Sequence, residues 1–408
     1  MTWAILAEFV YLGVALVPLL PLVLLQAVFY GPVVALVCLA LFGLVVWWLI
    51  QAGAWEPSGD APAAETPLYA VVESMCRQMN APRIHRIVLD DELNACAYQS
   101  RGLFSVLGVR RTLVLGIPLL FVLSEKEARG VIAHELAHFS RDHGRLGHWI
   151  YAVRSKWEQY LFGARGEHDF LDTVLRAIAA RFVPFFLSRS HRWSRACEFE
   201  ADALASQCEG PQALATGLVR LQVLDHVAAE ALPGELQALR LRGAQAPGDF
   251  WKRFRDLAAG SAQSHFEPAL HLSRTRPGRL HDTHPRLEER LAALRTPAQP
   301  PQWDSAPSAG DVLLGPSWAS VLAACEQRWQ ARASWHWKLD HIRLRWLAAR
   351  LVPAASERLG DIERATAQEE LSPSPETLRR LQDLAAAGPQ QPALLYHLGK
   401  ALLERGKR

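Results

Sequence analysis

Paired cysteines and an excess of one charge are both missing from this 408-residue sequence. The six cysteines include no Cys-x-x-Cys pair and follow no regular spacing, which argues against a disulfide framework. We therefore expect free, mostly buried thiols in a reducing compartment, with a cysteine nucleophile as the alternative. The 44 basic and 41 acidic side chains leave a net charge of only +3, so the composition argues against a nucleic-acid-binding protein.

Basic residues are absent from the first 76 positions, where two long apolar runs lie instead. Residues 9–30 and 32–50 are each about long enough to cross a ~30 Å hydrocarbon core, and Gly31-Pro32 suits a tight reversal. We predict a transmembrane helical hairpin over residues 1–50 that contacts the lipid bilayer; a buried helical hairpin is the alternative. A hairpin places the N-terminus and the long remainder on one side, but the positive-inside rule has few charges to count.

The run His-Glu-Leu-Ala-His at residues 134–138 is the clearest chemical signal in the sequence. On a helix, His134 and His138 lie four residues apart and project from one face. Two imidazoles at this spacing can hold one Zn²⁺, and Glu135 can reach a water on the same metal. The alternative is a core helix whose two histidines are satisfied by hydrogen bonds.

A second helix is expected around residues 194–205, with three carboxylates in largely apolar surroundings. Glu198 and Asp202 share a face at a spacing of four, whereas Glu200 points elsewhere. A catalytic zinc usually has three protein ligands and an open position. The spacing favours Glu198 as the third ligand and Asp202 as the acceptor for the outer N–H of a ligating imidazole. Glu200 is the alternative ligand.

These segments carry a family resemblance. HELAH at 134–138, SRACEFEAD at 194–202 and the N-terminal apolar pair resemble the HtpX and CAAX-prenyl-protease group of membrane-anchored zinc metallopeptidases. The resemblance covers residues 66–295 and implies a zincin-like domain with one Zn²⁺ per chain. It also implies that Glu198 is the third ligand.

Two shorter stretches fit the same group. Residues 93–98 resemble its Asn-Ala-x-Ala strand, which implies that Asn94, Ala95 and Ala97 pair with extended substrate. Residues 282–291 resemble its His-Pro…Arg segment, which implies that His284 assists near the metal. Pro285 favours an extended or turn conformation at His284, which could aim the imidazole from a loop.

The resulting hypothesis is a membrane-anchored zinc endopeptidase. The metal lowers the pKa of a water, and Glu135 takes its proton as general base and returns it to the leaving amine. His284 would hydrogen-bond the tetrahedral oxyanion. Polypeptides, including membrane proteins in quality control or prenylated proteins, are the expected substrates. The thiol pattern and the resemblance favour a bacterial inner-membrane protein whose catalytic domain faces the cytoplasm. The alternative is a membrane-anchored adaptor with a structural or degenerate zinc site.

The expected fold class is mainly α with a small β-sheet. The sequence predicts a helix over 67–80 and strands over 83–90, 94–99 and 112–116, with residues 101–102 and 110–111 in turns. Ser124 and Glu127 form the expected capping box of the zinc-binding helix.

The expected domain order places a linker at 51–66, the peptidase domain at 67–296, a Pro-rich linker at 297–316 and a C-terminal helical region at 317–408. Residues 146–161 and 170–187 contain charges that favour amphipathic helices over membrane spans. A long Trp- and Arg-rich helix is expected over 317–351, either packed on the protein or at a membrane interface. The stretch from residue 392 onward resembles the first helix of a tetratricopeptide repeat, and we expect a short helix pair there.

Overall fold

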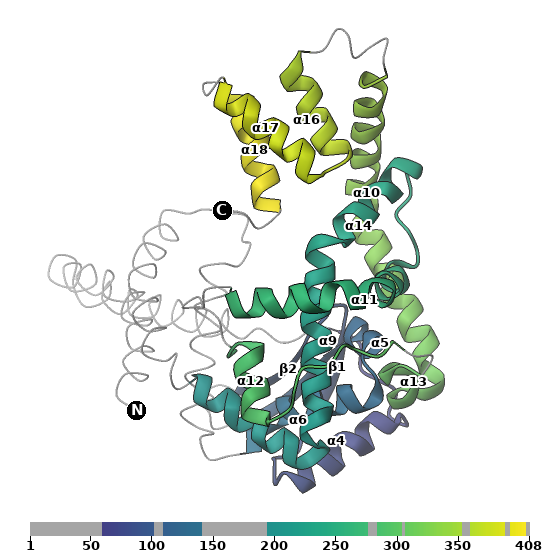
Figure 1. The fold of residues 1–408 in the computed structure, drawn as a ribbon. Coiled ribbons are helices and arrows are strands. Elements are labelled where there is room, and N and C mark those ends of the chain that lie inside the picture. Colours follow the sequence, from purple (N-terminus) through teal and green to yellow (C-terminus); the bar gives the residue numbers. More distant parts are fainter. Residues whose placement is uncertain are drawn as a thin grey trace, which may run out of the picture. The chain divides into compact units, whose positions relative to one another are not determined.

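The computed structural model describes residues 59–101, 109–140, 194–275, 284–303, 307–352, 360–387 and 392–404 (Figure 1). The expected hairpin at 1–50 and the expected helices at 146–187 lie outside these residues. Within the described ranges, no helix combines the length and the hydropathy needed to cross a membrane. The structure is mainly helical with one small mixed sheet, as predicted.

Two compact units make up the chain. The first comprises residues 1–218, 274–298 and 307–315, and the second comprises 219–273, 299–306 and 316–408. The domain boundaries expected from the sequence stay a prediction.

The sheet of the first unit has the strand order β1-β3-β2. β1 (Arg86–Asp90) pairs parallel with β3 (Val109–Gly116), and β2 (Ala95–Arg101) pairs antiparallel with β3. The expected strands exist, but β2 and β3 are longer than predicted. Arg110 and Arg111, expected in a turn, lie in β3 opposite Ser100 and Gln99, because the antiparallel pairing continues through them.

The core beneath the sheet continues from β3 into two helices. Leu113, Val114 and Leu115 of β3 are buried, as are all six residues of α5 (Ile117–Val122). α6 (Glu125–Ser140) follows, and it packs against β2 and α4 (Pro67–Gln78). At its start, the backbone N–H and the hydroxyl of Ser124 donate to Glu127 at 2.9 and 2.8 Å, which forms the predicted capping box. These contacts fix the helix that carries the His-Glu-x-x-His run.

α6 also lies very close to the start of α9 (Pro211–Glu230). A Cβ atom placed on Gly130 would sit 2.7 Å from the backbone nitrogen of Leu214. Only glycine fits at this contact without a backbone shift. The preceding helix, 194–209, carries the expected carboxylates and ends one residue before α9. The backbone contact at Gly130 therefore ties α6 to the segment that directly follows those carboxylates.

Part of the expected Pro-rich linker is packed helix. α13 (Ala309–Leu313) contacts α5 and α6, and Ala309 and Leu313 are buried. Ser308 caps α13 through Asp311, and the Ala309 N–H donates to the Leu123 carbonyl at 2.8 Å. Proline composition predicted a linker here, but apolar residues after the prolines make a short buried helix.

The second unit is helical in its described parts. It contains most of α9, α10 (Leu232–Arg242), most of α11 (Phe250–Thr275), the 33-residue α14 (Trp318–Arg350), α16 (Asp361–Leu371), α17 (Pro375–Ala387) and α18 (Pro392–Glu404). The 3₁₀ turn η3 (Gly315–Ser317) directly precedes α14. The rings of Phe250 and Trp329 stack at 3.9 Å, and Glu326 accepts hydrogen bonds from two N–H groups at the start of α11. Leu378, Leu381 and Leu394 form the core among α16, α17 and α18. The repeat-like C-terminal segment thus packs against two further helices.

Candidate metal centre

Two histidines of α6 project together from one face of the helix. The rings of His134 and His138 lie 4.9 Å apart in an edge-to-face arrangement. His134 is buried, and its Nε2 has no hydrogen-bond partner. A buried ring nitrogen without a partner is costly unless another group binds it.

Glu198 reaches both imidazoles from helix 194–209. Its Oε2 lies 3.5 Å from Nε2 of His134, and its Oε1 lies 3.6 Å from Nε2 of His138. Two ligands about 2.1 Å from a tetrahedral zinc would lie roughly 3.4 Å apart, so these separations suit one small ion. Among the described residues, the group that could hold a metal consists of His134, His138 and Glu198, which we call the ligand triad, and the alternative Glu200 is not in it.

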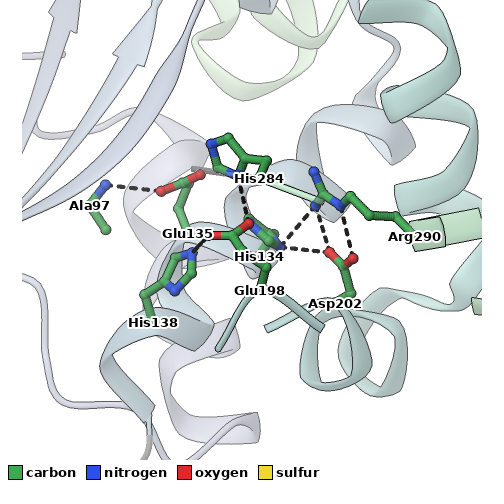
Figure 2. A network of polar contacts seen from close by, with 8 residues as sticks. All are labelled: Ala97, His134, Glu135, His138, Glu198, Asp202, His284 and Arg290. Atoms are coloured by element: carbon green, nitrogen blue, oxygen red, sulfur yellow. Dashed lines mark hydrogen bonds and ion pairs between the residues drawn. The ribbon is translucent and has the colours of Figure 1, made fainter. Parts of the chain in front are cut away.

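The other face of His134 is held by a buried ion pair (Figure 2). Asp202 Oδ1 lies 2.9 Å from Nδ1 of His134, the contact expected of an acceptor for the outer imidazole N–H. Arg290, from α12 (Leu287–Leu294), donates to both oxygens of Asp202, at 2.6 and 2.9 Å. Nη2 of Arg290 also lies 3.3 Å from Nδ1 of His134. These contacts hold the His134 ring with its Nε2 turned toward Glu198.

The side chain of Glu135 points toward the edge of the sheet (Figure 2). Its Oε2 accepts a hydrogen bond from the backbone N–H of Ala97 in β2 at 3.1 Å. Burial raises the pKa of Glu135, while the nearby His134 and His284 lower it in part. A carboxylate with a raised pKa, next to a metal-binding group, suits proton transfer near neutral pH.

The contact with Glu135 also defines the outer edge of β2. The backbone carbonyl of Asn94 accepts a hydrogen bond from the Gly116 N–H, so the backbone of Asn94 faces β3. Because the direction of the backbone groups alternates along a strand, Ala95 and Ala97 direct theirs away from β3. Asn94 Oδ1 accepts from the Ala95 N–H at 2.9 Å. Of the three expected substrate-binding residues, Ala97 is therefore the one in contact with the candidate catalytic group.

His284 lies against the third member of the triad. Its Nδ1 is 2.5 Å from Oε2 of Glu198, and its ring centroid is 6.5 Å from that of His134. The side chain is 54% exposed, in contrast to His134. The structure thus brings His284 to the metal centre, where its partner is a carboxylate.

The electrostatics of the triad follow from these contacts. Burial lowers the pKa of His134, but its contacts with Asp202 and Glu198 outweigh burial and raise the pKa to about 9. Burial and the neighbouring His134 lower the pKa of His138 to about 3. Burial alone would raise the pKa of Glu198, yet its contacts with His134 and His284 hold that pKa well below its usual range. The centre therefore favours positive charge at His134, which a cation can supply in place of a proton.

Arg290 is the residue whose role the sequence left unassigned. It shares the buried face of α12 with Leu287, Leu291 and Leu294. An arginine at a core-facing position needs a buried anion, and only a distant carboxylate could supply one. The spacing of the leucines around Arg290 was the feature of the sequence that could have revealed its buried position.

The site and the fold together define a class of protein. A helix-borne pair of histidines, an adjacent glutamate and a carboxylate from a second helix are the groups of a metallopeptidase. A family model described as peptidase family M48 matches residues 62–298, and the chain belongs to this family. The predicted resemblance is thereby confirmed.

The chain is also similar to curated relatives and to a solved structure. The chain is 25% identical over 289 residues to a protease HtpX homolog of Desulforapulum autotrophicum, covering 65% of this chain and 81% of the relative. It is 28% identical over 252 residues to a protease HtpX homolog of Burkholderia mallei, covering 59% and 78%. The crystal structure of S. mikatae Ste24p aligns with a TM-score of 0.36 and 17% identity over 72% of this chain and 67% of that one.

Proposed function

We propose that this metalloprotease is a membrane-anchored, zinc-dependent endopeptidase that cuts extended polypeptides, including membrane proteins in quality control. The observation that carries the proposal is the position of Glu135, which lies beside the ligand triad and touches the outer edge of β2. A structural zinc site would have no use for Glu135. The position of Glu135 therefore argues against the adaptor alternative.

His134, His138 and Glu198 are the proposed zinc ligands. The unpartnered Nε2 of His134 and the triad's spacing support this assignment. When bound, the zinc would supply Lewis-acid chemistry that acidifies a water and polarises the scissile carbonyl. Asp202, backed by Arg290, would keep the proton of His134 on Nδ1.

Glu135 is the proposed general base. It would take a proton from the attacking water and deliver it to the leaving amine. A backbone carbonyl of an extended substrate that pairs with the outer edge of β2 would accept the hydrogen bond from the Ala97 N–H in place of Glu135. Substrate pairing would then release the carboxylate for proton transfer, and cleavage would depend on extended conformation more than on side chains.

His284 would contribute by hydrogen bonding near the reacting carbonyl. Its contact with Glu198 and its exposed ring support a position at the rim of the metal centre. We assign it to the oxyanion, as a donor from its ring N–H, and not to the metal.

The proposed location is the bacterial inner membrane, with the catalytic domain facing the cytoplasm. Two apolar runs within residues 9–50 support an anchor. The five cysteines that the structure describes are free, which suits a reducing compartment.

Replacing Glu135 tests this function. Glu135→Gln should keep its fold and its zinc but lose about 10²–10⁴ in the rate of casein cleavage, because a general base is removed. Glu200→Gln, which changes a carboxylate of the neighbouring helix outside the triad, is the matched control and should cleave like the parent. Full activity in Glu135→Gln would overturn the mechanism.

A further inference from the structure

One face of α14 exposes large apolar side chains in a continuous row. Trp335, Leu339, Ile342 and Trp346 are 67%, 48%, 65% and 55% exposed. Their spacing of four, three and four residues places them within about 60° of arc and over about 16 Å of helix. We call this row the Trp stripe.

The opposite face of the same helix holds it in the protein. Trp337 and Leu344 are only 2% and 3% exposed, and the indole of Trp337 donates to the Gly243 carbonyl at 3.0 Å. α14 also packs against α10 and α16. The helix is therefore anchored without the Trp stripe, and the stripe is left for another contact.

Basic side chains lie along both sides of the stripe. Lys338 and Arg345 are exposed on one side. On the other side, Arg343 pairs with Glu370 at 3.0 Å, and the guanidinium of Arg350 lies 4.6 Å from the ring of Trp346. The acid of this segment, Asp340, lies off the stripe and pairs with Arg240 and Arg343. Arg350 also lies 3.6 Å from Glu363, so both arginines on this side have an acidic partner. The exposed face is thus apolar along its centre, with the exposed basic side chains of Lys338 and Arg345 along one margin.

We propose that the Trp stripe docks on an anionic lipid bilayer. Indole rings favour the interface between headgroups and acyl chains, and flanking Lys and Arg side chains can extend to lipid phosphates. A second copy of the stripe would bring Lys338 and Arg345 of two helices close together, which like charges disfavour. If the apolar runs of residues 9–50 form the proposed membrane anchor, they would keep a bilayer close to the stripe. The docking itself requires neither that anchor nor the metal.

A site-specific probe tests the docking. The full chain is prepared as Ile342→Cys, in the stripe, and as His336→Cys, an exposed position on the side of the same helix, each labelled with a polarity-sensitive fluorophore. Both are reconstituted with vesicles of phosphatidylcholine alone or with phosphatidylglycerol, with and without doxyl-labelled lipid, and the labelled parent gives the background from native thiols.

The proposal predicts strong doxyl quenching at position 342 in phosphatidylglycerol vesicles and weaker quenching at 336. Each basic side chain near an anionic leaflet contributes a factor of about five to the docked population. Lys338→Glu/Arg345→Glu should therefore abolish quenching at 342, whereas Arg379→Glu/Arg380→Glu on α17, with the same change in net charge, should not. Equal quenching at 342 and 336, or a blue shift at 342 that depends on protein concentration and not on lipid, would overturn it.

Discussion

Removing the charge of Arg290 should destabilise the protein far more than removing that of a similar arginine elsewhere. Arg290 binds both oxygens of Asp202, at 2.6 and 2.9 Å, and the two side chains are only 8% and 1% exposed. Arg290→Met keeps much of the side-chain volume and leaves the buried carboxylate with His134 alone. Losing one partner of a buried pair costs about 3–5 kcal/mol.

Arg129 provides the matched control, because it binds Glu209 with the same forked geometry. The two hydrogen bonds are 2.8 and 2.9 Å, but the side chains are 30% and 12% exposed. Exposed and partly exposed pairs contribute about 0–1 kcal/mol, so Arg129→Met should cost little.

Urea unfolding of the detergent-solubilised protein measures both free-energy changes. The zinc content of each variant should be measured as well. Arg290→Met should also weaken zinc binding about 10–100-fold, because Asp202 would hold His134 less firmly. An equal loss of stability in the two variants would refute the argument that burial decides the strength of these pairs.

Three further predictions concern the metal centre and the anchor. Alanine at any member of the ligand triad should abolish stoichiometric zinc by metal analysis, whereas Glu200→Ala should retain it; the reverse pattern at Glu198 and Glu200 would reassign the third ligand. His284→Ala should keep zinc and lower kcat about 10²–10³-fold, with His271→Ala close to the parent; zinc loss would make His284 a ligand instead. Deleting residues 1–50 should make the protein extractable by alkaline carbonate, and a truncated chain that stays in the pellet would indicate further membrane spans.

Local chemistry made much of the first unit predictable. The His-Glu-x-x-His spacing and the Ser124–Glu127 box marked α6, and the four-residue spacing of Glu198 and Asp202 put both carboxylates on one face of their helix. These signals act within one or two helical turns, which is the range over which sequence spacing fixes direction.

Contacts between segments that are distant in the sequence were harder to predict. The approach of His284 to Glu198 joins residues 86 positions apart, and the Arg290–Asp202 pair joins residues 88 apart. The placement of β3 between β1 and β2 likewise depends on packing that no local pattern contains. The prolines of residues 297–316 predicted a linker and concealed α13, because composition does not register how well a short apolar segment fills a core.

Metal removal and return is the most direct test of the central claim, that the triad holds a catalytic zinc. The purified full chain should cleave casein, lose that activity with a zinc chelator and regain it when one equivalent of Zn²⁺ is restored. Glu135→Gln should bind the same equivalent without cleaving. Undiminished casein cleavage by a chelated protein shown to contain no metal would contradict the account.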